Sequence, residues 1–407
     1  MATVADSFVK DIIEHPDDDT PRLIFADWLE EQGKDGQARI LRLKGVTREE
    51  IMQAIIAAPD DDALRIAFAR WLQEHCAAIE HEVARAEFIK LQCQAAMRGE
   101  RHQSEQERTL LRTHGTRWLE DMLGTHQIVW RGNDQYHFPE EDAEWTVDEP
   151  GCLPGIMMTD FQRGFLNRVG HHTREVAFLL AATRHRSPVT EVSVTPWHEG
   201  SFPAAIDSCV DHPSVQSLRL WTNDEFWHMD PSHLRRVVET NLSDLLRRLE
   251  VYHQWGSGGQ GVEPGYMNAL IDPSWEGLRE LSLGIGRIDG DQTATLLNAP
   301  LASELEVLRL RNNCLTKESE TILTRTALTR LRILDLEWCS VSPWTIHRLL
   351  ISETLPALER LRGPLQQMFH DREMASMMRR QKPFLQSLAK ERGITLELEG
   401  AEIIESA

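Results

Sequence analysis

Residues 305–315 read Leu-Glu-Val-Leu-Arg-Leu-Arg-Asn-Asn-Cys-Leu, which is the pattern L-x-x-L-x-L-x-x-N-x-L. Residues 331–341 repeat the pattern 26 positions later, with Cys339 in place of the asparagine. Because side chains alternate across a strand, leucines two residues apart predict a strand with one buried face. A strand and turn that recur at a regular interval predict a chain built of stacked units.

With these two included, the strand pattern occurs seven times, and it is weak at Leu358. The candidate strands begin at Val189, Val215, Leu246, Leu278, Leu305, Leu331 and Leu358, with spacings of 26, 31, 32, 27, 26 and 27 residues. This series resembles leucine-rich repeats, and its long spacing resembles the ribonuclease-inhibitor type, in which each unit returns through a helix. Helical spacing in residues 231–245, 291–297, 317–327 and 344–350 agrees, and residues 394–398 predict a closing strand. We therefore expect an α/β fold over residues 189–407, a solenoid with parallel strands on its concave face and helices on its convex face.

A second duplication occupies residues 1–96. Pro16-Asp17-Asp18-Asp19 recurs as Pro59-Asp60-Asp61-Asp62, and each copy is followed by Phe-Ala-x-Trp-Leu. The apolar residues Phe25, Trp28 and Leu29, and their counterparts Phe68, Trp71 and Leu72, have helical i, i+3, i+4 spacing. We interpret the two tryptophans as core residues, with interface anchoring as the alternative. The aspartates are expected to cap helices, with Asp19 or Thr20 as the first cap, rather than to bind a metal.

The first copy, residues 9–31, resembles the bacterial repeat-companion domain, a module that accompanies repeat arrays. Its Arg-Ala-Glu-Phe-Ile-Lys-Leu-Gln ending stands at residues 85–92, and residues 110–119 and 161–165 resemble the family's link into leucine-rich repeats. The second copy departs from the pattern at Arg70, where the first has Asp27. The resemblance implies architecture alone: an all-α region over 1–96, a helical or irregular linker and cap over 97–188, and the repeats over 189–407.

Composition restricts the class of partner. The formal charge of −20 disfavours nucleic acid, because a protein that neutralises phosphates needs a basic surface. Residues 140–149 carry six carboxylates and no Lys or Arg, which we interpret as a solvated loop, with partner docking as the alternative. No long apolar run and no signal segment is present, so we expect a cytoplasmic chain without membrane contact.

The sequence contains only weak matches to motifs for catalysis or for cofactor and metal binding. The six cysteines form no Cys-x-x-Cys pair, and the adjacent His171 and His172 have no nearby Cys or spaced His partner. Residues 256–261 spell Gly-x-Gly-x-x-Gly, but Pro264 and Gly265 follow where a dinucleotide site needs a helix. We therefore expect no catalytic residue, no cofactor and no metal.

The alternation of side chains along a strand predicts a binding surface, because the residues between the leucines would line the concave face. Trp221 and Tyr252 hold the same position on adjacent strands, and aromatic residues beside arginines are typical of interface hot spots. The predicted partner-binding residues are Trp197, Arg219, Trp221, Arg248, Glu250, Tyr252, Trp255, Arg309, Arg311, Asp335 and Glu337. The alternative is that Arg219–Glu250 and Arg309–Asp335 are cross-strand charge pairs that keep the sheet soluble.

These observations predict a non-enzymatic scaffold that recognises a protein partner through its leucine-rich repeats. A first alternative is a regulatory or inhibitory subunit of a bacterial effector or defence system. A second, of a different class, is an enzyme with a site in residues 97–188.

Overall fold

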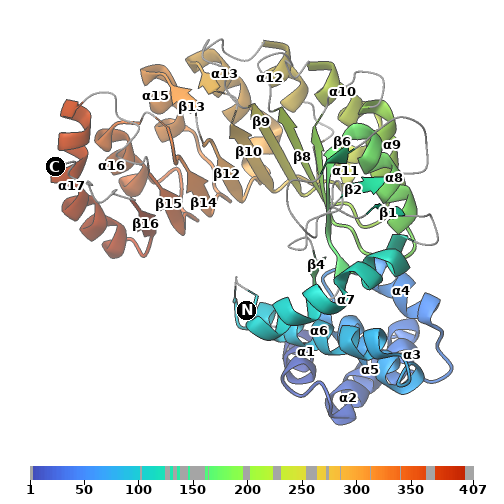
Figure 1. The fold of residues 1–407 in the computed structure, drawn as a ribbon. Coiled ribbons are helices and arrows are strands. Elements are labelled where there is room, and N and C mark those ends of the chain that lie inside the picture. Colours follow the sequence, from blue (N-terminus) through green and yellow to red (C-terminus); the bar gives the residue numbers. More distant parts are fainter. Residues whose placement is uncertain are drawn as a thin grey trace, which may run out of the picture. The chain divides into compact units, whose positions relative to one another are not determined.

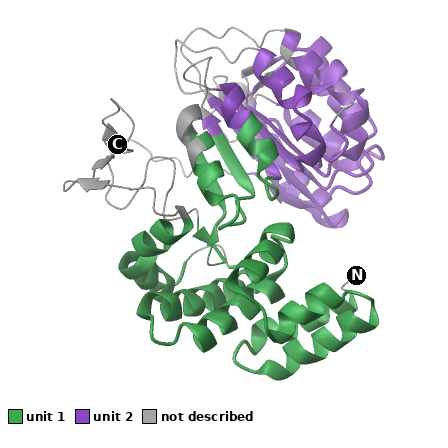
Figure 2. Cartoon of the chain, turned by 90° about the vertical axis from the view of Figure 1, so that its right-hand side faces the viewer, with its two compact units in different colours: residues 1–193, 207–215 green, residues 194–206, 216–407 purple. Residues whose placement is uncertain are grey.

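The computed structural model describes residues 3–100, 103–123, 129–131, 135–137, 145–146, 161–163, 165–195, 202–222, 231–253, 264–271, 275–284, 286–311, 313–339, 341–363 and 372–398. The chain forms two compact units (Figure 2). Unit 1 comprises residues 1–193 and 207–215, and unit 2 comprises residues 194–206 and 216–407. No helix in the described ranges is long and apolar enough to cross a membrane.

Unit 1 begins with helices only, as the sequence predicts. They are α1 (Val4–Glu14), α2 (Asp19–Glu31), α3 (Asp35–Arg42), α4 (Arg48–Ala57), α5 (Asp62–His75), α6 (Glu80–Met97) and α7 (Glu105–Leu123). The aspartate triplets cap helices, but one position earlier than expected for α2. The Asp18 side chain accepts a hydrogen bond from the backbone N–H of Thr20, and Asp61 accepts from Ala63 and Leu64. These carboxylates satisfy backbone N–H groups that lack a partner within the helix.

The core of unit 1 buries the duplicated apolar residues. Phe25, Leu29, Phe68 and Leu72 are buried, whereas Trp28 and Trp71 are partly buried and pack against the edge of the same cluster. Trp71 also donates its indole N–H to the carbonyl of Val46 at 3.1 Å. The two tryptophans are thus peripheral core residues of the helical region.

Strands follow the helices in unit 1. A three-stranded antiparallel sheet contains β1 (Val129–Arg131), β2 (Gln135–His137) and β3 (Trp145–Thr146). A hairpin joins β4 (Phe161–Gln162) to β5 (Phe165–Leu166), and then come β6 (Arg168–His172) and α8 (Thr173–Thr183). Strand β7 (Glu191–Thr195) follows and crosses into unit 2 at Val194. Apart from β3, the acidic stretch 140–149 lies outside the described residues. Residues 97–188 therefore hold several short strands besides the helices expected there.

Unit 2 alternates strands and helices. After α9 (Phe202–Asp211), which spans the unit boundary, come β8 (Ser217–Thr222), α10 (Pro231–Glu239), α11 (Leu242–Leu245), β9 (Arg248–His253), α12 (Pro264–Leu270), β10 (Glu280–Gly284), β11 (Gly286–Ile288), α13 (Gly290–Leu297), α14 (Pro300–Glu304), β12 (Val307–Arg309), β13 (Asn313–Leu315), α15 (Lys317–Arg325), β14 (Ile333–Asp335), α16 (Pro343–Ile351), β15 (Arg360–Arg362), α17 (Arg372–Glu391) and β16 (Thr395–Glu397). All four helical segments predicted between the strands are present, and so is the closing strand β16.

The main sheet has nine strands in the order β16-β15-β14-β12-β10-β9-β8-β7-β6. From β8 to β16 each neighbouring pair is parallel, and β12 pairs with β14 through Val307↔Ile333, Leu308↔Leu334 and Arg309↔Asp335. All seven strands predicted from the leucine pattern belong to this sheet, while β6 was not predicted. In unit 2 the helices α10, α12, α13 and α15 lie along one face of the strands (Figure 1).

Candidate partner-binding surface

The strands of unit 2 sort their side chains into two sets. Leu218, Leu249, Leu281, Leu308 and Leu334, which are aligned in the register, are each 0 % exposed. The residues between such leucines point to the opposite face, because successive side chains alternate along a strand. We call this set the polar face: Ser217, Arg219, Trp221, Arg248, Glu250, Tyr252, Glu280, Ser282, Gly284, Val307, Arg309, Ile333, Asp335, Arg360, Arg362, Thr395 and Glu397, together with Arg311 and Glu337 just past their strands.

Ion pairs run across the polar face from strand to strand. Arg219 Nε lies 2.6 Å from Glu250 Oε2, Arg248 Nε lies 2.9 Å from Glu280 Oε2, and Arg309 Nη1 lies 3.2 Å from the same Glu280 oxygen. Further along, Arg311 and Arg362 both contact Asp335 Oδ2, at 2.7 and 3.5 Å. Each carboxylate therefore bridges neighbouring strands.

The predicted pair Arg219–Glu250 is present, whereas the predicted pair Arg309–Asp335 is wrong. Arg309 and Asp335 do face each other in the register of β12 and β14, but Arg309 contacts Glu280 of β10 instead. The residue beside Arg309 on β10 is the uncharged Ser282, so the long arginine reaches diagonally to the nearest carboxylate. Asp335 is already held by two other arginines.

The polar face is almost neutral in a chain of strongly negative charge. It carries six arginines (Arg219, Arg248, Arg309, Arg311, Arg360, Arg362) and five acids (Glu250, Glu280, Asp335, Glu337, Glu397), a balance of +1, whereas the whole chain has a charge of −20. Burial alone would raise the pKa of Glu280, but hydrogen bonds and charges from Arg248 and Arg309 outweigh burial and lower that pKa. Glu280 therefore stays ionised at neutral pH.

Asp335 is the most buried of these acids, and its replacement tests the network. The Asp335 side chain is 1 % exposed, and it also accepts the backbone N–H of Glu337 at 3.1 Å. We expect Asp335→Asn to lower the free energy of unfolding by about 2 kcal/mol, because two partly exposed arginines lose their shared carboxylate. Glu359→Gln removes an exposed ion pair with Arg332 and should change the free energy of unfolding by less than about 0.5 kcal/mol. Equal urea midpoints for the two variants would show that the network contributes nothing.

The predicted aromatic residues differ in exposure. Trp221 is 41 % exposed, the largest exposed apolar side chain on the polar face. Tyr252 is partly buried because its ring lies on Gly284, where an added Cβ would come within 2.5 Å of Tyr252 Cδ1. Trp197 and Trp255 lie outside the described residues, as does the glycine-rich motif 256–261. Of the two predicted aromatic residues that the structure describes, Trp221 is therefore the more exposed and is open for contact.

Trp338 was not predicted as a site residue. It follows Glu337 in the turn after β14, is 37 % exposed, and has a backbone φ of +61°. Bulky residues rarely adopt this left-handed conformation, and such residues cluster at binding sites where the surrounding structure holds them. The signal in the sequence was a tryptophan directly before Cys339, in the turn of the best repeat pattern.

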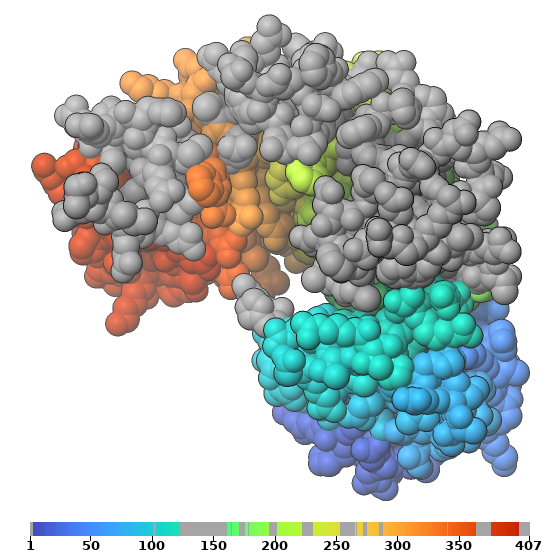
Figure 3. All heavy atoms as spheres, in the orientation of Figure 1, coloured from blue at the N-terminus to red at the C-terminus, as the bar shows by residue number. Residues whose placement is uncertain are grey.

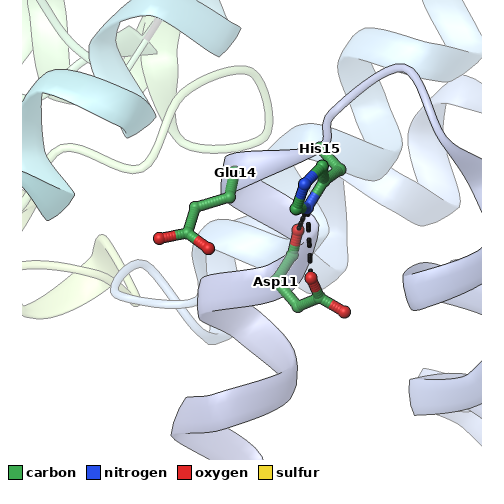
Figure 4. A group of neighbouring side chains, drawn as sticks. All are labelled: Asp11, Glu14 and His15. Carbon is green, nitrogen blue, oxygen red and sulfur yellow. Dashed lines mark hydrogen bonds and ion pairs between the residues drawn. The ribbon is translucent and has the colours of Figure 1, made fainter.

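Among the described residues of unit 1, two groups of side chains resemble metal ligands. Figure 4 shows Asp11, Glu14 and His15, all exposed, with His15 Nδ1 lying 3.1 Å from Asp11 Oδ1. Glu14 pairs instead with Lys10 at 3.7 Å. In the second group, His81 Nε2 lies 3.4 Å from Asp121 Oδ2, but arginines already contact its carboxylates: Arg48 binds Glu82, and Arg117 lies 3.6 Å from Asp121. Neither group provides several free ligand atoms in one buried place.

Comparison with known proteins adds no assignment. Neither a scan against protein-family models nor a search of curated proteins returned a match to this chain.

Proposed function

We propose that this chain is a leucine-rich-repeat protein whose solenoid binds a protein partner on the polar face and carries no catalytic site. The register supports the repeat assignment, because leucines of successive candidate repeats align strand by strand in a parallel sheet. Helices lie on the other face of these strands, so the polar face is the side left for a ligand.

One observation carries the proposed interface: Trp221 remains exposed beside a network of arginines on a nearly neutral face. A large aromatic side chain that faces water does not stabilise the fold. At an interface, a few such side chains contribute most of the binding free energy. The charge network preorganises the surface, because the ion pairs hold each arginine in place before the partner binds. A protein partner fits this surface better than nucleic acid, because most of the arginine charge is already neutralised.

The partner can be captured from the native host by affinity purification and mass spectrometry, and its affinity for variants then measured. We expect Trp221→Ala with Tyr252→Ala to weaken binding by more than about 2 kcal/mol, the usual hot-spot threshold. The matched control is Leu245→Ala on α11, which removes an exposed apolar side chain away from the polar face and should leave affinity unchanged. Full affinity in a folded double variant would contradict the proposed surface.

A further inference from the structure

The last two helices of unit 2 present exposed aromatic side chains. Trp344 and Ile351 of α16 are 59 and 47 % exposed, and Phe384 of α17 is 53 % exposed. His347 connects them: its ring centroid lies 6.3 Å from that of Trp344 and 5.6 Å from that of Phe384. The three rings therefore form one continuous strip across both helices. Figure 3 colours the C-terminal part of the chain that contains α16 and α17 from orange to red.

This strip is not needed to anchor the helices. The opposite sides of α16 and α17 are buried through Ile346, Leu349, Leu350, Met378, Leu385 and Ala389, each at most 2 % exposed. Each helix thus already has an apolar side toward the core, and a second apolar side is not explained by folding. Clustered apolar surface that faces water marks an interaction site.

Positive charge predominates on the two helices that carry the strip. Helices α16 and α17 carry six Lys or Arg residues (Arg348, Arg372, Arg379, Arg380, Lys382, Lys390) and two Glu residues (Glu373, Glu391), a balance of +4. Arg348, Arg379, Arg380 and Lys390 are exposed, and none of these four has an acidic partner among the residues that the structure describes. The arginines of the polar face, in contrast, are paired with acids. We call these four cations, with Trp344, His347 and Phe384, the C-terminal patch.

We propose that the C-terminal patch binds an acidic polypeptide segment that carries an aromatic or other large apolar residue. The unpaired cations supply charge complementarity, and the aromatic strip supplies the apolar contact that fixes the segment. A polypeptide is favoured over nucleic acid because the chain's charge of −20 repels an extended polyanion, while a short segment senses only charges within about 8 Å, the screening length in physiological salt. This patch is separate from the polar face, so the two proposals can fail independently.

The probe is a fluorescein-labelled peptide with the sequence of residues 138–149, Phe-Pro-Glu-Glu-Asp-Ala-Glu-Trp-Thr-Val-Asp-Glu. It has six carboxylates, two aromatic residues and no Lys or Arg. Its binding to the full chain is measured by fluorescence anisotropy. We expect at least about tenfold weaker binding after Arg379→Glu with Arg380→Glu, and again after Trp344→Ala with Phe384→Ala. A peptide with all six acids changed to amides should also bind at least about tenfold more weakly.

The matched control is Lys317→Glu with Arg325→Glu on α15, which makes the same change in net charge at exposed residues of another helix. It should alter the affinity by no more than about twofold at physiological salt, because distant charges are screened. An equal loss of affinity in this control would show that binding depends on the net charge of the chain and not on the C-terminal patch, and it would overturn the proposal. Absence of peptide binding at about 1 mM chain, or tighter and patch-dependent binding of single-stranded DNA, would also overturn it. Circular dichroism of every variant confirms that it is folded.

Discussion

Replacing Phe165 by Ala should lower the free energy of unfolding by about 3–5 kcal/mol, the range for buried aromatic residues. Phe165 comes from strand β5, yet its side chain is 0 % exposed in the core of the N-terminal helices. Its ring centroid lies 5.6 Å from that of Phe68 on α5. The hairpin β4–β5 is thereby joined to the helical region, and the substitution leaves a cavity between them.

Two buried arginines enlarge this expected effect. The guanidinium carbons of Arg65 and Arg85 lie 5.4 and 5.1 Å from the Phe165 ring centroid, and both side chains are at most 2 % exposed. Several of their nitrogens have no hydrogen-bond acceptor among the residues that the structure describes, so the ring faces provide part of their compensation, beside Asp62 at 3.7 Å from Arg65 Nε. Burial lowers the pKa of Arg85 to about 10, which keeps it charged at neutral pH.

Denaturant unfolding followed by circular dichroism measures this effect. Phe165→Leu keeps most of the volume but removes the ring, so it should cost less than Phe165→Ala and still more than a surface substitution. Phe384→Ala, at an exposed position, is the matched control and should shift stability by less than about 0.5 kcal/mol. An unfolding midpoint for Phe165→Ala equal to that of the control would refute the buried role of the ring.

Asn313→Ala should cost about 3 kcal/mol, the second large effect that we expect. The Asn313 side chain is buried, and its Nδ2 donates to the carbonyls of Leu283, Leu310 and Arg311 at 2.6, 2.8 and 3.1 Å. The amide therefore ties the turn after β12 to strand β10. Its loss removes a donor from these buried carbonyls, of which Leu310 keeps a second donor, Cys339 Sγ.

The isosteric change Asn313→Asp separates hydrogen bonding from packing. It keeps the shape but replaces the donor by an oxygen that faces three carbonyl oxygens, so it should destabilise the chain at least as much as Asn313→Ala. Asn298→Ala, at an exposed helix end, serves as the control. If Asn313→Asp were tolerated, the amide donor would have no structural role.

Short-range patterns in the amino-acid sequence specify the elements and the register of unit 2. Leucine spacing of two residues sets which side of a strand is buried, and this preference is local, so the alignment of Leu308 with Leu334 follows from the repeat pattern alone. The helices between the strands and the caps of α2 and α5 likewise follow from such patterns, with an error of one residue at Asp18. Within the candidate site, the Arg219–Glu250 pair was predictable because register places the two residues side by side.

Tertiary packing, in contrast, sets which residues distant in sequence meet, and which of them remain exposed. Arg309 pairs with Glu280. Its long side chain can reach several acids, so the sequence alone does not determine which one it contacts. Phe165 lies in the helical core, although it belongs to a strand and follows Phe68 by 97 residues. No periodic pattern in the sequence predicts such a contact. The exposure of Trp221, Trp338 and Trp344 depends on what packs around each ring. Local patterns encode the direction of a side chain, whereas its neighbours are set by how the elements pack.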